Sequence, residues 1–393
     1  MQPAMTEQVF LVGGVRTAVG RFGGAFREIP AQRLGAMVIE EALRRAGVPK
    51  EQVDEVIMGN AISAGLGQNP ARQAAMHAGL PVEIGALTVN KVCGSGLKAV
   101  MLAAQAIRAG DADIIAAGGM ENMSASPHLL RGARWGMKFG DFPVTDAMIH
   151  DGLWDVYNDY HMAVTGERIA ARYGVTREEA DRFAFMSHQK ALNARREGAL
   201  KEEILPVETG GGPASKDECV REDTSPEKLA ALTPVFKKDG ILTAGNSSKL
   251  SDGAAALVVA SGRRTMELGL MPLARVVGYA TGGTRPEDVM EAPIPTVRAL
   301  LKETGLTIEE MDLIEHNEAY SSASIVVARE LKIPPERFNV NGGAVALGHP
   351  IGCSGARILV TLLYALKTRG LKRGLATLCL GGGNAVAMII ERE

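Results

Sequence analysis

Short apolar runs alternate with amphipathic stretches along the first third of the chain. Apolar runs that end in glycine or a polar turn predict buried strands over residues 9–12, 56–59, 86–89 and 114–119. Apolar residues at helical spacing predict helices between them, over residues 32–46 and 97–107. Strands that alternate with helices predict an α/β protein with a parallel sheet covered on both faces.

The pattern changes after Met120. Residues 124–245 are polar, charged and rich in loop-forming residues, and Gly210-Gly211-Gly212-Pro213 interrupts them. Within this region, residues 176–197 predict a charged, exposed helix with Thr176 as its N-cap. We interpret residues 124–245 as an inserted loop domain.

The C-terminal part repeats the order of the first part. Val89-Asn90 is followed by a small-residue turn around Cys93, a helix and an apolar strand. Val340-Asn341, the matching strand position, is followed by a small-residue turn around Cys353, a helix and the apolar strand 375–380. A duplicated α/β unit explains this repetition. Its active site is expected where the strands end, because open α/β sheets bind ligands there.

Composition limits the class of protein. A chain of 393 residues with 46% apolar residues is long enough for two or three domains with a large core. The formal net charge of −2 gives no support for a nucleic-acid surface. Local basic residues can still bind a small anionic molecule.

The number of cysteines and the N-terminal sequence indicate the cellular compartment to expect for this protein. Four cysteines are too few for a disulfide scaffold, and no Cys or His cluster has metal-ligand spacing, so we expect no metal site. Residues 1–8 lack the basic and apolar segments of a secretory signal, and no uninterrupted apolar run reaches the roughly 18 residues of a membrane span. We therefore expect a reduced, cytoplasmic protein outside the membrane.

Cys93 is the first candidate for chemistry. It lies at a glycine-flanked junction between strand and helix, where unpaired N–H groups and the helix macrodipole favour a thiolate. Its small neighbours leave room for a substrate at the sulfur, as a covalent nucleophile requires. A small buried cysteine that packs a tight turn fits the same segment, so both interpretations stay open.

Three further segments place reactive side chains after apolar strands. They are His316-Asn317-Glu318, the glycine-rich loop that displays His349, and Cys379 before a glycine triplet. Taken singly, a histidine before proline is more often a loop residue, and a cysteine in an apolar strand more often packs the core. Their coincidence at predicted strand ends indicates a cysteine-nucleophile enzyme that transfers an acyl group.

Four segments resemble the signature blocks of thiolases. They are Asn90-Lys91-Val92-Cys93-Gly94-Ser95-Gly96, His316-Asn317-Glu318-Ala319, Gly348-His349-Pro350-Ile351-Gly352 and Cys379-Leu380-Gly381-Gly382-Gly383. With Arg16-Thr17 near the start, the matches run from residue 16 to residue 383. The resemblance implies two duplicated βαβαβαββ halves that form a five-layered αβαβα core. The N-terminal half would comprise residues 1–123 and 246–273, and the C-terminal half residues 274–393.

The resemblance also implies roles for the reactive side chains. Cys93 would take the acyl group from one acyl-CoA, with His349 accepting its thiol proton. Cys379 would take a proton from the methyl group of a second acetyl-CoA, or return that proton in the cleavage direction. His349 and a water held by Asn317 would stabilise one oxyanion, and the backbone N–H groups of Cys93 and Gly381 the other.

Two neighbouring residues are given other interpretations. Cys353 occupies the Cys93-like turn of the second copy, but Cys379 carries the family match, so Cys353 is assigned to packing. Glu318 either orients Asn317 or a water, or is a solvated acid at a helix start.

Coenzyme A and acyl-CoA are implied as substrates, with no permanently bound cofactor. By motif match, Ser248 would contact the pantetheine and Arg221 would lie near the adenine and phosphate end. His161 and Leu153 fall in the segment that lines the pantetheine tunnel. For Arg221, an ordinary surface arginine is the competing interpretation.

The prediction of the acyl chain length rests on fewer residues than the prediction of the family. His161-Met162 resembles short-chain, acetoacetyl-CoA-forming thiolases, in which the methionine narrows the acyl pocket. Tyr320, Lys249 and Asn384 depart from the residues usual in the family, and Asn246-Ser247-Ser248 leans toward the broad-range degradative branch.

The favoured function is therefore an acetyl-CoA C-acetyltransferase that interconverts two acetyl-CoA with acetoacetyl-CoA and CoA. A broad- or long-chain 3-ketoacyl-CoA thiolase of fatty-acid β-oxidation is the nearest alternative. A thiolase-like protein that binds acyl-CoA without turnover is the alternative of another class. The family also implies a homodimer or homotetramer, with the tetramer contact in the inserted region.

Overall fold

The structure is a computed structural model and describes residues 7–393. The expectation that the chain has no secretory signal rests partly on residues 1–6, which lie outside the described residues. The first half has the expected βαβαβαββ order, with its last strand after the inserted region. Its elements are β1 (Val9–Thr17), α1 (Ala31–Ala46), β3 (Glu55–Gly59), α2 (Pro70–His77), β4 (Gly85–Val89), α3 (Ser95–Ala109), β5 (Ile114–Asn122) and β13 (Ser251–Ser261).

The second half repeats this order with one difference. Its elements are β14 (Ala274–Gly283), α8 (Pro293–Thr304), β15 (Leu313–His316), α9 (Ser321–Glu330), α11 (Ile351–Arg369), β16 (Arg373–Leu380) and β17 (Asn384–Arg392). The expected strand at Val340-Asn341 is wrong, because these residues lie in a turn. The third strand is reduced to one parallel bridge between Ile314 and Phe338.

The side chain of Asn339 explains this lost strand. Its backbone is left-handed, with φ of 44°, which ends any extended segment. Its amide Nδ2 donates to the His316 carbonyl at 2.9 Å, and its Oδ1 accepts the His316 N–H at 2.8 Å. One amide side chain therefore makes the bonds that a neighbouring strand would have made.

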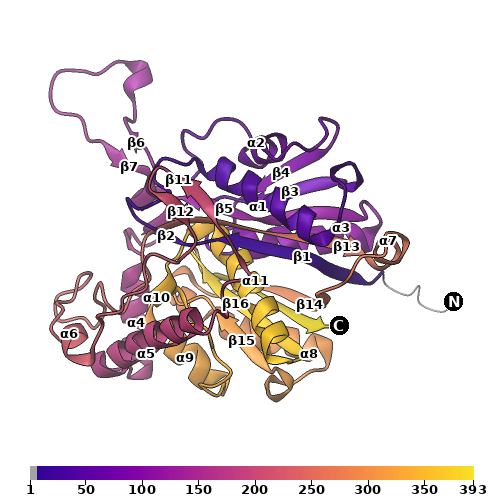
Figure 1. The fold of residues 1–393 in the computed structure, drawn as a ribbon. Coiled ribbons are helices and arrows are strands. Elements are labelled where there is room, and N and C mark those ends of the chain that lie inside the picture. Colours follow the sequence, from indigo (N-terminus) through magenta and orange to yellow (C-terminus); the bar gives the residue numbers. More distant parts are fainter. Residues whose placement is uncertain (1–6) are drawn as a thin grey trace.

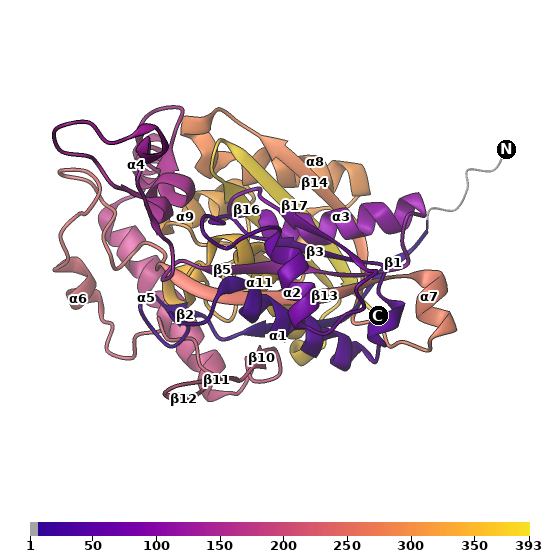
Figure 2. The ribbon, with the colours of Figure 1, turned by 90° about the horizontal axis from the view of Figure 1, so that it is seen from above.

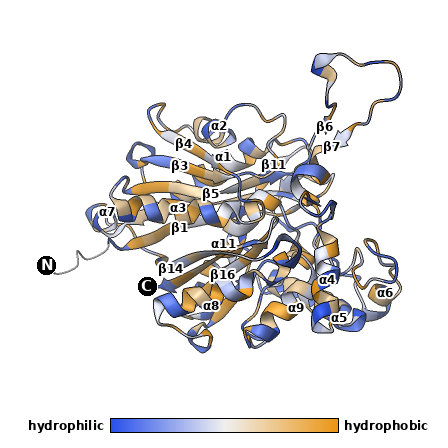
Figure 3. Ribbon diagram, turned by 180° about the vertical axis from the view of Figure 1, so that it is seen from behind, coloured by the Kyte–Doolittle hydropathy of each residue, from blue (hydrophilic) through white to orange (hydrophobic). Residues whose placement is uncertain are grey.

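The two halves form two sheets that face each other across a pair of helices. The strand order is β15-β16-β17-β14-β1-β13-β5-β3-β4, and β1 meets β14 only at Phe10 and Leu11. Helices α3 and α11 lie between the sheets, α1 and α2 cover the first sheet, and α8 and α9 cover the second (Figures 1 and 2). The strands between these helix layers are largely hydrophobic (Figure 3). This is the five-layered αβαβα core that the family resemblance implied.

Helices α3 and α11 approach each other closely at their first turns. A Cβ on Gly96 of α3 would clash with the backbone of Ala356, and a Cβ on Gly355 of α11 would clash with the backbone of Leu97. Only glycine allows this reciprocal contact. It lies directly after Cys93 in one half and after His349 in the other.

Helix α11 is also long, apolar and almost entirely buried. Among residues 7–393 it is the one helix with the length and composition of a membrane span, and 89% of that window is buried inside the protein. Its apolar surface packs between the two sheets.

The inserted region contains short strands and two long helices. Its elements are β6 (His128–Leu129), η2 (Ala133–Trp135), β7 (Thr145–Asp146), η3 (Met148–Leu153), β8 (Trp154–Asp155), β9 (Tyr160–His161), α4 (Ala163–Tyr173), α5 (Arg177–Arg196), β10 (Ile204–Leu205), β11 (Val207–Thr209), β12 (Gly212–Ala214) and α6 (Pro226–Ala230). The β6–β7 hairpin projects from the body with a long tip (Figure 1). Smaller elements elsewhere are β2 (Gly20–Arg21), η1 (Lys50–Gln52), α7 (Gly262–Glu267), η4 (Pro286–Glu291), η5 (Ile308–Glu310) and α10 (Ala344–Leu347).

Helix α5 begins as expected but is not fully exposed. Thr176 and Glu179 form a reciprocal capping box at its start. One face, including Ala184 and His188, is buried, so the expectation of an exposed helix is wrong. The outward face is hydrophilic (Figure 3).

A buried ion network ties the inserted region to β1. The Arg16 guanidinium donates to Glu203 at 2.6 Å and to Asp217 at 2.7 Å and 3.0 Å, and none of the three side chains is accessible to more than a trace of solvent. Burial raises the pKa of Glu203, whereas the Arg16 charge holds the pKa of Asp217 low. Breaking this network would leave buried charges unpaired.

Candidate active site

A cleft of about 780 Å³ opens between the inserted region and the two halves. Four of the residues expected to bind acyl-CoA line it, together with the expected base; they are Leu153, His161, Arg221, Ser248 and His349. Three of its lining residues come from the π-helical segment Met148–Leu153, a wide turn that often marks functional sites.

Met162 does not line this cleft. It is buried in an apolar cluster that also contains Cys379, Met290 and Tyr320. Its N–H donates to the Leu153 carbonyl at 2.8 Å. Met162 therefore supports the cleft wall from behind.

Cys93 lies on a strained turn between β4 and α3. The preceding Val92 has φ of +46°, an unfavourable conformation for a β-branched residue. The Asn90 Oδ1 accepts the Val92 N–H at 3.0 Å. The Ser95 hydroxyl accepts the Lys91 N–H at 2.8 Å and donates to the Val92 carbonyl at 2.7 Å. These bonds hold the strained backbone that presents Cys93.

The thiol of Cys93 is protonated in the free protein. Burial raises its pKa to about 11, although the backbone N–H groups of Gly381 and of Cys93 itself act in the opposite direction. The backbone N–H groups thus favour the thiolate, but burial outweighs them in the free protein. A base has to accept the proton before the sulfur can attack.

His349 has the geometry of such a base. Its backbone N–H donates to the Lys249 carbonyl at 3.0 Å. Its Nδ1 lies 2.5 Å from the Ser354 hydroxyl, which donates its own proton to the Pro350 carbonyl at 2.8 Å. Because that hydroxyl proton is already used, His349 must carry its proton on Nδ1 and donate it to Ser354. The lone pair is then on Nε2.

The environment keeps this imidazole neutral. Burial lowers the pKa of His349 to about 3, and the buried Arg357 guanidinium adds to the effect. The Asn317 Nδ2 lies 3.3 Å from the His349 Nε2, so the two groups share one end of the site. The Asn317 Oδ1 is buried without a protein partner and is available to a water or a substrate.

Cys379 is the second thiol of the site. It is buried near the end of β16, with its Sγ 3.7 Å from the Met290 Sδ. Burial, with a contribution from Cys93, raises its pKa to about 12. Both thiols also raise the pKa of the buried Tyr320, a cleft-lining residue, after burial itself. These mutual effects indicate that Cys93 and Cys379 lie near each other and near Tyr320, which lines the cleft.

Glu318 is not a solvated acid at a helix start, which is one of its two interpretations. It is buried, and its carboxylate accepts the Ser187 hydroxyl at 2.7 Å, the Asn339 Nδ2 at 2.8 Å and the Val345 N–H at 3.1 Å. It therefore is not a solvated acid, and its bonds go to neighbouring segments rather than to the Asn317 side chain. It joins α5 and the start of α10 to the loop after β15.

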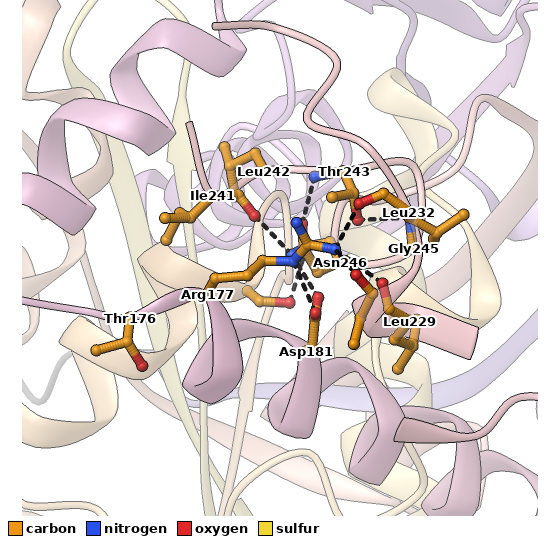
Figure 4. A network of polar contacts seen from close by, with 12 residues as sticks. Thr176, Arg177, Asp181, Leu229, Leu232, Ile241, Leu242, Thr243, Gly245 and Asn246 are labelled. Atoms are coloured by element: carbon orange, nitrogen blue, oxygen red, sulfur yellow. Dashed lines mark hydrogen bonds and ion pairs between the residues drawn. The ribbon is translucent and has the colours of Figure 1, made fainter. Parts of the chain in front are cut away.

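Asn246 fixes the loop that carries Ser248. Its Nδ2 donates to Asp181 at 2.8 Å and to the Ile241 carbonyl at 2.9 Å, and its Oδ1 accepts the Thr243 N–H at 2.8 Å (Figure 4). Asp181 is in turn held by Arg177 at 2.7 Å. Ser248 itself donates its backbone N–H to the Ala319 carbonyl at 3.0 Å. The cleft wall is thus fastened to α5 and to the active-site loop.

At the mouth of the cleft, two expected ligand contacts have distinct surroundings. His161 stacks on Phe236 with ring centroids 4.9 Å apart. Arg221 is largely exposed and lies 3.4 Å from Asp223. Arg221 is therefore both a surface arginine and a cleft residue.

Sequence reasoning missed two residues that support the reactive groups. Ser354 fixes the His349 tautomer, and Glu121 accepts backbone N–H groups of Ala61, Ile62 and Gly352. Burial raises the pKa of Glu121 to about 7. Ser354 lies five residues after His349, at the start of a helix, so its contact with His349 could have been predicted from that spacing. No local sequence pattern marks Glu121.

The remaining cysteines differ in position. Cys353 is buried in the central cluster between the sheets, where burial raises its pKa to about 12. Cys219 lines the cleft and lies 3.8 Å from the Ser251 hydroxyl. Within residues 7–393, no three His, Cys, Asp or Glu side chains gather into a group that could hold a metal ion.

The fold and this site define the thiolase class. Residues 9–263 match the thiolase N-terminal domain and residues 270–392 match the thiolase C-terminal domain, so the chain belongs to the thiolase family. It is 52% identical to an acetyl-CoA acetyltransferase of Cupriavidus necator, over 99% of this chain and 100% of that protein. It is 49% identical to a probable acetyl-CoA acyltransferase of Staphylococcus aureus, over 98% and 99%. The crystal structure of the Bacillus anthracis acetyl-CoA acetyltransferase matches the whole of both chains, with a TM-score of 0.97 and 41% identity.

Proposed function

We propose that this thiolase is an acetyl-CoA C-acetyltransferase, which condenses two acetyl-CoA to acetoacetyl-CoA and CoA in a reversible Claisen reaction. The observation that carries the proposal is the gathering of two cysteines and a histidine at one site: Cys93 and Cys379 lie near Tyr320, and His349 lies between Ser354 and Asn317. Relatives named acetyl-CoA acetyltransferase that cover essentially the whole chain support it.

In the first step, the Cys93 thiol gives its proton to the Nε2 of His349 as the sulfur attacks the thioester of acetyl-CoA. CoA leaves, and an acetyl-Cys93 enzyme remains. The Ser354 hydroxyl stabilises the imidazolium through Nδ1. The low pKa of His349 makes this charge short-lived, so the proton returns readily to the departing CoA sulfur.

In the second step, the thiolate form of Cys379, which has first lost its thiol proton to solvent, takes a proton from the methyl group of another acetyl-CoA. The resulting carbon attacks acetyl-Cys93, and the Cys93 sulfur leaves and takes up the proton that Cys379 received. Negative charge develops on a thioester oxygen in each step. A water held by Asn317 stabilises one oxyanion, and His349 contributes to it only while its Nε2 carries a proton. The backbone N–H groups of Cys93 and Gly381 stabilise the other, and their direction toward the Cys93 sulfur supports this role.

CoA binding is assigned to the cleft. Ser248 contacts the pantetheine, His161 and Leu153 line its path, and Arg221 meets the phosphate and adenine end at the exposed mouth. Their common cleft supports these assignments. Met162, which is buried and bonded through its backbone N–H to the Leu153 carbonyl, limits the acyl pocket from behind the cleft wall.

The acyl chain length has one competing proposal. The relatives from Staphylococcus aureus are named more broadly, as acetyl-CoA acyltransferases, which favours a broad- or long-chain 3-ketoacyl-CoA thiolase of β-oxidation. Acyl-CoA binding without turnover is a weaker alternative, because both thiols and the histidine are present. The buried Met162 favours the short-chain activity.

One assay tests these functions together. The purified protein is mixed with CoA and 3-ketoacyl-CoA of four to sixteen carbons, and loss of the enolate absorbance is followed. Preference for the four-carbon substrate is expected. A preference for long chains would refute the acetoacetyl-CoA assignment, and no cleavage at any length would refute the enzyme. Cys93→Ala should abolish acylation, whereas Cys379→Ala should acylate without condensing.

The assembly and compartment are part of the same proposal. The protein is a cytoplasmic homodimer or homotetramer, and residues 124–245 act as one loop domain between the halves 1–123 with 246–273 and 274–393. In the β6–β7 hairpin, Trp135 and Phe139 are almost fully exposed, which supports a contact between copies there. Light scattering of the wild type and of Trp135→Ser with Phe139→Ser tests this: a lower mass for the double variant is expected, and equal masses would refute the contact.

A further inference from the structure

A second cavity lies between α5 and α9, separate from the acyl-CoA cleft. The two helices pack against each other (Figure 1). The cavity has a volume of about 430 Å³ and shares no lining residue with the cleft. Cavities of about 300 to 1,000 Å³ are typical of small-molecule sites. This cavity is therefore large enough to be a binding site of its own.

Apolar side chains form most of its walls. Phe183 of α5 meets Phe338 edge to face, with ring centroids 6.5 Å apart. Ile325 and Ala328 of α9, and Ile333 after that helix, add to the apolar lining. An apolar ligand that binds against these side chains removes both surfaces from water. The walls therefore favour a ligand with an apolar body.

Positive charges outnumber negative charges around the cavity. Its lining includes four cationic side chains and two carboxylates: Arg182, Lys190, Arg329 and Lys332, with Glu179 and Glu318. Glu179 accepts Arg329 at 2.5 Å, and its other oxygen caps the start of α5. Within residues 7–393, Arg182 and Lys332 form no ion pair with a carboxylate. The cavity therefore attracts an anion.

Lys190 has an N–H group left for such an anion. Its Nζ donates to the Pro335 carbonyl at 3.0 Å and to the Phe338 carbonyl at 2.7 Å. An ammonium has three N–H groups, so one remains for a ligand. A charge-assisted bond from this group to a carboxylate is stronger than a bond between neutral groups. Lys190 can therefore hold the head group of an anionic ligand.

The floor of the cavity, formed by Ser187, Glu318 and Asn339, is buried and already hydrogen-bonded. Glu318 accepts the Ser187 hydroxyl at 2.7 Å and the Asn339 Nδ2 at 2.8 Å. The Asn339 Oδ1 accepts the His316 N–H at 2.8 Å. Because these polar groups satisfy one another, an apolar chain can lie over them without breaking a hydrogen bond.

We propose that this cavity binds a small aliphatic carboxylate, with its head group on Lys190 and its chain along Phe183 and Ile325. Phe183 and Lys190 lie seven residues apart on α5. This spacing is about 10 Å along the helix axis, which a chain of about eight carbons can span. Arg182 and Lys332 steer the anion toward the cavity. The site goes beyond the proposed function, because it shares no residue with the acyl-CoA cleft.

Isothermal titration calorimetry of the full-length protein with sodium octanoate tests the site. Saturating CoA is present throughout, so that the catalytic cleft is occupied. One octanoate should bind per chain, and octylammonium, which has the same chain and the opposite charge, should bind at least about 10-fold more weakly. Octanoate binding that appears only when CoA is omitted would place the ligand in the catalytic cleft and overturn the proposal. No binding, or equal affinity for octylammonium, would also overturn it.

Two variants and a matched control locate the ligand. Lys190→Met removes the head-group contact and should weaken octanoate binding at least about 10-fold. Arg337→Met is the control, because Arg337 also donates to two backbone carbonyls, of Glu309 at 2.8 Å and Met311 at 3.3 Å, but lies outside the cavity. Ala328→Phe fills the cavity and should abolish binding. Equal weakening in Lys190→Met and Arg337→Met would overturn the proposal, as would full binding by Ala328→Phe with an unchanged urea midpoint. Thiolase activity of the wild-type sample reports separately on the proposed function.

Discussion

Replacing Ser354 with alanine should slow acylation of Cys93 with little effect on the fold. The Ser354 hydroxyl accepts the Nδ1 proton of His349, and this bond strengthens when the imidazole becomes charged. A hydrogen bond to a charged group contributes about 2 kcal/mol, which corresponds to about 30-fold in rate. The first turn of α11 keeps its backbone bonds, since the Pro350 carbonyl still accepts the N–H groups of Cys353 at 3.0 Å and Ser354 at 2.9 Å.

The rate of acetyl-Cys93 formation, measured by rapid quench and intact-protein mass spectrometry, reports this step directly. Ser322→Ala is a matched control, because Ser322 is equally buried and its hydroxyl donates to the Gly166 carbonyl at 2.8 Å. Both variants should unfold at similar urea concentrations, and only Ser354→Ala should lose acylation rate. An acylation rate within about 2-fold of wild type would refute the tautomer argument.

Three further predictions concern charge and packing. Without substrate, the rate of Cys93 alkylation by iodoacetamide should rise about tenfold per pH unit between pH 7 and pH 9, because the pKa of the thiol lies near 11. A rate that does not change with pH would instead indicate an ion pair between Cys93 and His349. Asn246→Ala should raise the KM for acyl-CoA by about 10-fold and change kcat less, since it frees the loop at the pantetheine; steady-state kinetics with an unchanged KM would contradict this. Arg16→Met should lower the free energy of unfolding by about 3–5 kcal/mol in urea, because two buried carboxylates lose their partner, and a loss below about 1 kcal/mol would show that they are solvated.

The alternation of strands and helices could be predicted from local patterns, but the expectation of a parallel sheet is wrong, because β13 pairs antiparallel with β1 and β5 and β17 pairs antiparallel with β14 and β16. The apolar run 114–119 and the helical spacing over residues 32–46 can be recognised from neighbouring residues alone. Strand β5 and helix α1 lie at these positions. The third strand of the second half could not, because Asn339 replaces its ladder bonds with side-chain bonds to His316. Such a substitution depends on residues 23 positions apart.

The site was predictable by residue type but not by charge state. The motifs predict one site for Cys93, His349 and Cys379, and the helix N-terminus at Cys93 suggests a thiolate, whereas burial raises the pKa of this thiol. Burial depends on segments far away in the sequence, which local reading does not include. Glu318 shows the same limit, since its partners Ser187 and Asn339 come from other elements.

The reciprocal glycine contact of α3 and α11 has a consequence for how the chain can diversify. Gly96 and Gly355 let two helix backbones touch, immediately after the turn of Cys93 and the loop of His349. The spacing of nucleophile and base is therefore set by this crossing and is independent of the length of chain between them. Insertions and deletions in the outer loops can accumulate without moving the reacting atoms, whereas a single methyl group at either glycine shifts them apart.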